Sequence, residues 1–166
     1  MLNVTGGHDG QVQHGTTCPH RPLVTHETGQ NGVMLLTEID HIAIAVKDLE
    51  AAIEYYRKAF GAEVHHREIV ESDGVEEALV KVADSYIQLT AATRPDSPIA
   101  KSIEKRGEGL HHIGYRVEDC AKALEAMLAA GATAIDRAPR PGSRGTTVAF
   151  MHPKGSFGTL IELVQE

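Results

Sequence analysis

Polar and apolar positions follow the same order twice between residue 38 and the end of the chain. The first half predicts one alternating strand, one helix with apolar residues at helical spacing, and three further strands, at 39–46, 49–60, 63–71, 75–83 and 85–91. The second half repeats this order at 111–117, 120–130, 132–137, 146–152 and 158–164. A repeat of this kind means that the halves share a fold, so each half is predicted to be a β-α-β-β-β module.

The residues that begin and end helices support this division. Asp48 and Asp119 stand where a side chain can cap the first turn of each helix, and glycine follows each helix at its end. A short connecting helix is expected at 97–106, with Pro98 in its first turn. The segment 138–145, which follows the predicted strand at 132–137, is expected to be a loop because it is rich in Pro and Gly.

The N-terminal segment differs from the rest of the chain. Residues 1–33 are rich in Gly, Thr, Gln and His and contain almost no apolar clusters. Such a segment cannot bury enough surface to offset the entropy lost on ordering. We therefore expect a disordered extension over residues 1–35 and one domain over 36–166, with module one at about 38–95, the linker helix at 97–106 and module two at about 109–166.

Composition narrows the classes of function. The chain has 166 residues, of which 42% are hydrophobic and 23% charged, with a formal net charge of −7. The acidic balance argues against nucleic acid as a partner but allows an anionic small molecule. No apolar run approaches the ~20 residues that span a bilayer, and no signal peptide is visible. Cys18 and Cys120 are too few for a disulfide framework, so a cytoplasmic location is expected.

Polar residues recur at matching places in the two halves. Each half has a histidine seven residues before the aspartate that opens its helix, and each ends in an apolar strand with one lone polar side chain. Taken singly, each would be interpreted as solvent-facing or hydrogen-bonded, but their recurrence favours one shared metal site. Two imidazoles, a carboxylate and an amide oxygen suit Co²⁺, Mn²⁺, Ni²⁺ or Zn²⁺. The four residues are His41, Gln88, His112 and Glu162.

Strand alternation assigns further residues to faces. Ala43, Ala45 and Gly114 share the histidine faces and would leave room for a ligand, whereas His111 is expected to point to the opposite face. Glu77 follows the Asp73-Gly74 turn and lies on the strand face opposite its apolar neighbours. A carboxylate near a metal but not bound to it is suited to proton transfer.

Residues 36–166 resemble the methylmalonyl-CoA epimerases, a family of the vicinal oxygen chelate superfamily that also includes glyoxalase I. The resemblance covers nearly the whole chain after the N-terminal segment, and the 107–113 motif is its most specific part. The residues that carry it are IDHIAIA at 39–45, GVEEAL at 74–79, GEGLHHI at 107–113, HPKG at 152–155 and ELV at 162–164.

The resemblance implies a fold and a reaction. The fold would be α+β, with two β-α-β-β-β modules forming an open cup-shaped sheet around a metal, Co²⁺ being favoured. His41, Gln88, His112 and Glu162 fall on the family's metal-ligand positions, and Glu77 on that of an acid/base carboxylate. The reaction would be epimerisation of an acyl-CoA substrate at C2 through an enolate. Metal-bound Glu162, another side chain or a water would transfer the proton on the opposite face of the substrate. The family resemblance also implies a homodimer.

Alternatives remain open at this point. Ser143, Arg144 and Lys154 stand on loops and either hold the substrate's carboxylate or CoA phosphates or belong to solvated loops. A glyoxalase I-like lyase or a dioxygenase is a second interpretation, but Gln88 as fourth ligand and Glu77 as separate base weigh against it. A metal-free small-molecule-binding protein is a third, against which the complete ligand set counts.

Overall fold

The computed structural model describes residues 35–166, so the expected N-terminal extension lies almost wholly outside the described residues, and its boundary stays a prediction. Module one comprises β1 (Glu38–Val46), α1 (Leu49–Phe60), β2 (Val64–Val70), β3 (Val75–Val82) and β4 (Ser85–Ala92). The connecting helix is α2 (Pro98–Arg106). Module two comprises β5 (Gly109–Arg116), α3 (Cys120–Ala129), β6 (Arg140–Pro141), β7 (Thr147–Met151) and β8 (Ile161–Gln165), with 3₁₀ turns η1 (Ser143–Gly145) and η2 (Pro153–Gly155).

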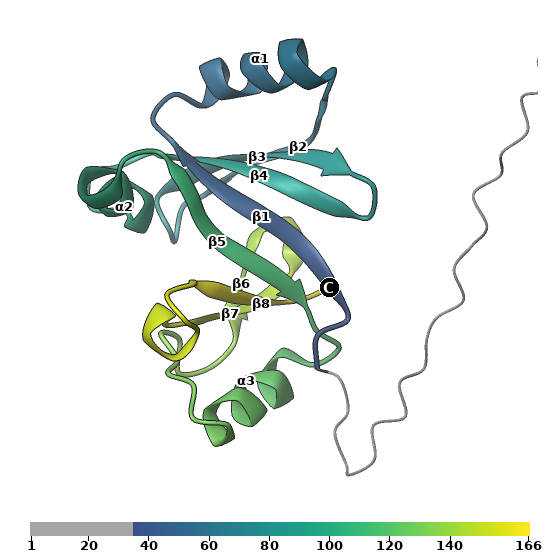
Figure 1. The fold of residues 1–166 in the computed structure, drawn as a ribbon, viewed down its shortest axis with the longest axis vertical. Helices are drawn as coiled ribbons and strands as arrows, with labels where there is room; N and C mark the ends of the chain where they lie inside the picture. The colour runs from purple at the N-terminus through teal and green to yellow at the C-terminus, as the bar shows by residue number, and fades with distance from the viewer. Residues whose placement is uncertain (1–34) are drawn as a thin grey trace, which may run out of the picture. The chain divides into compact units, whose positions relative to one another are not determined.

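The strands form one eight-stranded mixed sheet whose order reflects the repeat. The order is β2-β3-β4-β1-β5-β8-β7-β6. In each module the first strand pairs in parallel with the last strand, β1 with β4 and β5 with β8. The two first strands, β1 and β5, pair antiparallel in the middle, between the halves that carry α1 and α3 (Figure 1). The predicted fold class of two β-α-β-β-β modules in an α+β sheet is confirmed.

The second strand of module two departs from the prediction. The chain at 132–137 makes only an isolated bridge, between Ala134 and Met151, and the two-residue strand β6 lies inside the segment predicted to be a loop. Ile135 and Asp136 both donate to the carbonyl of Phe150, and the Asp136 carboxylate accepts the Phe150 N–H at 2.8 Å. The side chain thus takes the place of a backbone acceptor, and the ladder ends there.

Both long helices begin and end as predicted from their caps. The Asp48 carboxylate accepts the Ala51 N–H at 2.9 Å, and Asp119 accepts the Lys122 N–H at 3.0 Å. Gly61 ends α1 in the left-handed conformation, with φ of 66°. Within residues 35–166, no helix has the length and apolar character that crossing a membrane requires.

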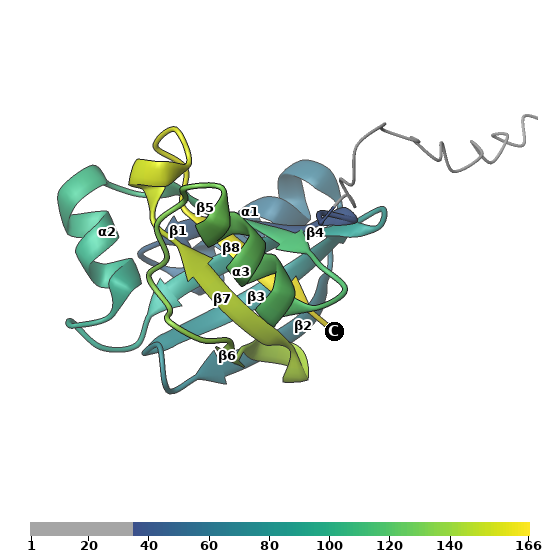
Figure 2. The same ribbon diagram turned by 90° about the horizontal axis from the view of Figure 1, so that it is seen from below.

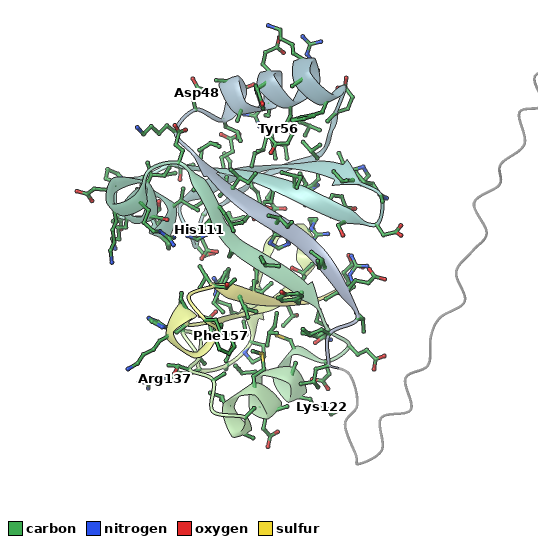
Figure 3. The ribbon with its side chains drawn as sticks, viewed as in Figure 1. Asp48, Tyr56, His111, Lys122, Arg137 and Phe157 are labelled. Atoms are coloured by element: carbon green, nitrogen blue, oxygen red, sulfur yellow. The ribbon has the colours of Figure 1, made fainter. Side chains whose placement is uncertain are left out.

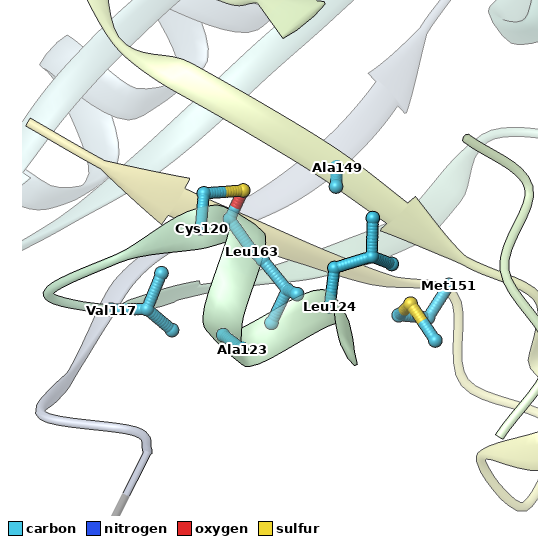
Figure 4. Close-up of a cluster of buried hydrophobic side chains, with 7 residues drawn as sticks. All are labelled: Val117, Cys120, Ala123, Leu124, Ala149, Met151 and Leu163. Atoms are coloured by element: carbon cyan, nitrogen blue, oxygen red, sulfur yellow. The ribbon is translucent and has the colours of Figure 1, made fainter. Parts of the chain in front are cut away.

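The helices cover one face of the sheet in each module. α3 lies across β7 and β8, where Leu124 packs with Met151 and Leu163 in a buried cluster (Figures 2 and 4). α1 packs in the same way on β3 and β4 in module one. Each covered strand therefore points alternate side chains to the uncovered face, which carries the polar residues described next.

Candidate metal centre and active site

Two rows of residues cross the four central strands on the uncovered face. In one row Gln88 of β4 lies opposite Ala43 of β1, which lies opposite His112 of β5. In the other, His41 of β1 lies opposite Gly114 of β5, which lies opposite Glu162 of β8. The two rows are equivalent: Gln88 faces Ala43, two residues after His41, and Glu162 faces Gly114, two residues after His112. The repeat brings the four predicted residues onto one patch of the sheet.

A small residue at the centre of each row makes space for the side chains on either side. A methyl group on Gly114 would overlap the imidazole of His41. The space that Gly114 was predicted to leave for a ligand is therefore filled by the imidazole of His41.

The donor atoms of three residues converge. His41 Nε2 lies 3.0 Å from His112 Nε2 and 2.9 Å from Glu162 Oε2, and His112 Nε2 lies 3.0 Å from the same oxygen. All three side chains are buried, and together they form a group able to hold a metal ion. Two ligand atoms that sit about 2.1 Å from one ion at right angles lie about 3.0 Å apart. The spacing and the N, N, O donor set therefore fit a divalent cation.

Charges inside this cluster favour the ionised carboxylate. Burial alone would raise the pKa of Glu162, but hydrogen bonds from His112 and His41 hold it well below its ordinary value. Burial likewise opposes a charge on His41, yet its hydrogen bonds to Asp40 and Glu162 raise its pKa to about 9. An ionised Glu162 is the form that a metal requires of this ligand.

Gln88 presents its amide to the same space. Its Nε2 donates to Glu77 Oε2 at 2.7 Å, which turns the amide oxygen the other way. That oxygen is buried and has no hydrogen-bond partner among residues 35–166. A buried acceptor without a partner is costly, and coordination to a cation would satisfy it. Gln88 as the fourth ligand stays a prediction that this geometry favours.

Glu77 lies beside the metal-type cluster without belonging to it. It stands on β3 opposite Thr90 and is only 4% exposed. Burial raises the pKa of its carboxyl to about 6, and the side chain of Ser143 and the charge of His41 offset this rise in part. Its neighbour Glu76 points to the other face, where it pairs with Arg67 at 2.8 Å. The predicted separation of the two glutamates by strand alternation is confirmed.

A cavity of about 190 Å³ joins these groups. Its polar wall includes Glu77, Gln88, His112 and Glu162, and its apolar wall includes side chains from β3, α2 and β7. The site thus offers a cation-binding corner and an adjacent, separately held carboxylate in one enclosed space.

The expected orientation of His111 is wrong. His112 pairs with Ala43 while Leu110 pairs with Ile44, so His111 is the extra residue of a β-bulge. A bulge breaks the alternation of side chains, and His111 consequently lines the cavity beside His112, with their Nδ1 atoms 2.8 Å apart. Figure 3 labels it near the start of β5, close to α2. Burial lowers the pKa of His111 to about 4, and the charge of His112 adds to the effect.

The three predicted substrate-binding residues lie in different surroundings. Ser143 lines the cavity, and Lys154 is exposed on η2. Arg144 lies outside the cavity lining, and its Nη2 donates to Asp40 Oδ1 at 2.6 Å.

Asp40 is a functional candidate that the sequence reasoning missed. Its carboxylate is wholly buried, and Oδ1 lies 2.8 Å from His41 Nδ1 while Oδ2 accepts Arg116 Nη2 at 2.9 Å. Burial opposes ionisation, but the hydrogen bonds to His41 and Arg116 outweigh it and lower the pKa of Asp40 to about 2. The only signal in the sequence is the position of an acid directly before a ligand histidine inside a strand.

Comparison with known proteins agrees with this fold. Residues 40–150 match the family model described as the Glyoxalase/Bleomycin resistance protein/Dioxygenase superfamily. The protein therefore belongs to that superfamily.

Its relatives narrow the assignment. The ethylmalonyl-CoA/methylmalonyl-CoA epimerase of Cereibacter sphaeroides is 38% identical over 133 residues, which cover 79% of this chain and 99% of the relative. A variant of Streptomyces coelicolor methylmalonyl-CoA epimerase, in complex with 2-nitronate-propionyl-CoA, is 42% identical with a TM-score of 0.76 and covers 79% and 98% of the two chains. Methylmalonyl-CoA epimerase from Mycobacterium tuberculosis is 36% identical with a TM-score of 0.77, covering 82% and 93%. Within the superfamily, the chain belongs to the methylmalonyl-CoA epimerase family.

Proposed function

We propose that this protein interconverts the R and S epimers of methylmalonyl-CoA at C2. Family membership supports the substrate, since relatives that carry this name cover most of the chain. The observation that carries the chemistry is the position of Glu77. It is a buried carboxylate that lines one cavity with His112 and Glu162, and it accepts a hydrogen bond from Gln88.

His41, Gln88, His112 and Glu162 would hold a divalent ion, for which we favour Co²⁺ over Mn²⁺, Ni²⁺ and Zn²⁺. Such an ion supplies Lewis-acid stabilisation of the charge that develops on the substrate oxygens when the C2 proton leaves. Asp40 would accept the Nδ1 proton of His41, which leaves the Nε2 lone pair of His41 to bind the ion.

Glu77 would remove the C2 proton from one face of the substrate. Its Oε2 is held by the Gln88 amide, and its Oε1 is buried without a partner among the described residues, so this second oxygen is the one available to take a proton. Epimerisation also needs a group that returns a proton to the opposite face. The candidates are Glu162, which would first have to take up a proton and exchange its role as metal ligand, another side chain, or a water. Because both carboxylates are buried in the cavity wall, few water molecules can reach the enolate to protonate it at random.

Ser143, in the cavity wall, would hold the substrate carboxylate or thioester, and Lys154, exposed on η2, would contact the CoA phosphates.

We also propose a cytoplasmic location, in line with the scarcity of cysteine. Recovery of the protein in a membrane or secreted fraction would contradict this location. A homodimer is proposed because the edge strand β2 exposes Ile69, and a monomeric mass by light scattering would contradict it.

Proton NMR of methylmalonyl-CoA in D₂O tests the function directly. The protein should exchange the C2 proton of both epimers for deuterium. A chelator should stop the exchange, and an added divalent ion should restore it. A protein with stoichiometric metal that leaves the C2 signal unchanged would contradict the proposal.

A further inference from the structure

Arg144 occupies a backbone conformation that is unfavourable for arginine. Its φ of 55° and ψ of 19° lie in the left-handed region, inside the η1 turn. Such a conformation persists only when the surrounding structure over-determines it, and it often marks a functional position. The side chain is also withdrawn from solvent, at 14% exposure, although arginine is seldom buried without partners.

Three contacts hold this residue in place. Its backbone N–H donates to Glu68 Oε2 at 2.9 Å, its Nη2 donates to Asp40 Oδ1 at 2.6 Å, and its guanidinium lies 5.2 Å from the centre of the Tyr86 ring. Its Nη1 also lies 3.5 Å from Glu166 Oε1. Glu68, Asp40 and Tyr86 belong to β2, β1 and β4, which are all strands of module one. Arg144 therefore fastens a turn of module two onto the sheet of module one.

Two residues next to Arg144, Asp40 and Ser143, contact or line the proposed site. The Asp40 oxygen that accepts Arg144 is the same oxygen that lies 2.8 Å from His41 Nδ1. Loss of the guanidinium would leave that oxygen free to rotate away from the imidazole. On the other side, Ser143 precedes Arg144 directly, lines the cavity and interacts with Glu77. A change in the η1 turn would therefore reach Glu77 through Ser143.

We propose that Arg144 is a positioning residue of the active site: its guanidinium holds Asp40 against His41, and its anchored turn keeps Ser143 in the cavity beside Glu77. The proposal rests on the proposed function, and it assigns Arg144 a role different from contact with the CoA phosphates. The two roles differ in kinetics. Loss of a positioning residue lowers kcat, whereas loss of a group that binds the substrate equally throughout the reaction raises KM and leaves kcat unchanged.

The variant Arg144→Asn tests this role. Asparagine enters the left-handed region more readily than most residues, so the change removes the guanidinium without adding backbone strain. We expect kcat for epimerisation to fall by about tenfold or more with KM unchanged, as for the loss of a group that orients a metal ligand. We also expect Co²⁺, titrated by its visible absorption, to bind about tenfold more weakly. Arg144→Lys should recover part of both losses because it keeps a cation near Asp40.

The matched control is Arg137→Asn. Arg137 is exposed and lies at the periphery of module two (Figure 3), so kcat and Co²⁺ affinity should equal those of the wild type. Wild-type kcat and Co²⁺ affinity in Arg144→Asn, or a raised KM alone, would overturn the proposal. If Arg144→Asn does not fold, an Arg144→Lys variant that equals the wild type in both measurements would overturn it. Failure of the proposed function is recognised separately, as a wild type without C2 exchange, and the Co²⁺ titration then still decides the role of Arg144.

Discussion

Single residues of this protein have roles that their neighbours across the sheet determine. Gly114 carries no chemistry, yet it lies directly opposite His41, and the space that it leaves is filled by the imidazole. Strand alternation placed Gly114 on the histidine face, two positions after His112, and predicted room for a ligand there. That the room holds the His41 ring depends on the pairing of β1 with β5, which alternation alone does not give.

Gly114→Ala should therefore remove the metal. The added methyl group would overlap the His41 ring, and the ring can escape only by leaving the position at which its Nε2 meets His112 and Glu162. We expect metal bound per protein chain, measured by elemental analysis after dialysis, to fall by at least about tenfold, as when a ligand loses its orientation. Wild-type metal content with an intact fold would show that the ring has another place to go.

Asp40 shows where residue-level prediction ends. Alternation places it on the strand face opposite His41, and nothing local indicates that it is buried. Its partners Arg116 and Arg144 stand 76 and 104 positions further along the chain. A contact across such separations depends on the completed sheet, so the neighbouring residues of the sequence carry no record of it.

At the scale of elements, the sequence was informative where local chemistry decides the structure. Helix starts and stops were found because capping aspartates and terminal glycines act within one turn. The bulge at His111 and the shortened strand at 132–137 were missed. Both depend on a partner strand, the first on the register with β1 and the second on the Asp136 side chain that accepts the Phe150 N–H.

The helix caps provide a prediction at this scale. Asp48→Ala removes the acceptor of the Ala51 N–H, and Asp119→Ala removes that of the Lys122 N–H. Each change should lower the free energy of unfolding by about 1 kcal/mol in urea titrations, with metal content unchanged. The control Asp84→Ala, at an exposed turn, should change it by less than about 0.5 kcal/mol. A loss of metal in either cap variant would mean that the helices position the site more directly than the contacts show.

At the scale of the whole domain, the two modules contribute equally to one site. In the proposed ligand set, module one would supply His41 and Gln88 and module two His112 and Glu162, while the central pairing of β1 with β5 brings them together. Neither module alone would hold more than half of this proposed set. This arrangement explains why the repeat itself was the strongest signal of function in the sequence, since a shared site requires matched positions in both halves.

Glu77 lies in this shared site and belongs to module one. Its neighbour Glu76 is on the same strand but points to the other face and serves as a control. We propose that Glu77, which lies outside the proposed set of metal ligands, removes the C2 proton from one face of the substrate. Glu77→Gln keeps the shape and polarity of the side chain but cannot accept a proton. Glu76→Gln changes a residue that pairs with Arg67 on the other face.

The measurement that tests this claim most directly is C2 exchange in D₂O by metal-loaded Glu77→Gln, followed separately from each epimer. We expect stoichiometric metal and exchange slower by about 10²-fold or more from the epimer whose proton faces Glu77, with a smaller effect on the other epimer. Glu76→Gln should exchange both epimers at the wild-type rate. Normal exchange by Glu77→Gln with metal bound would contradict the account, because it would place the base elsewhere in the cavity.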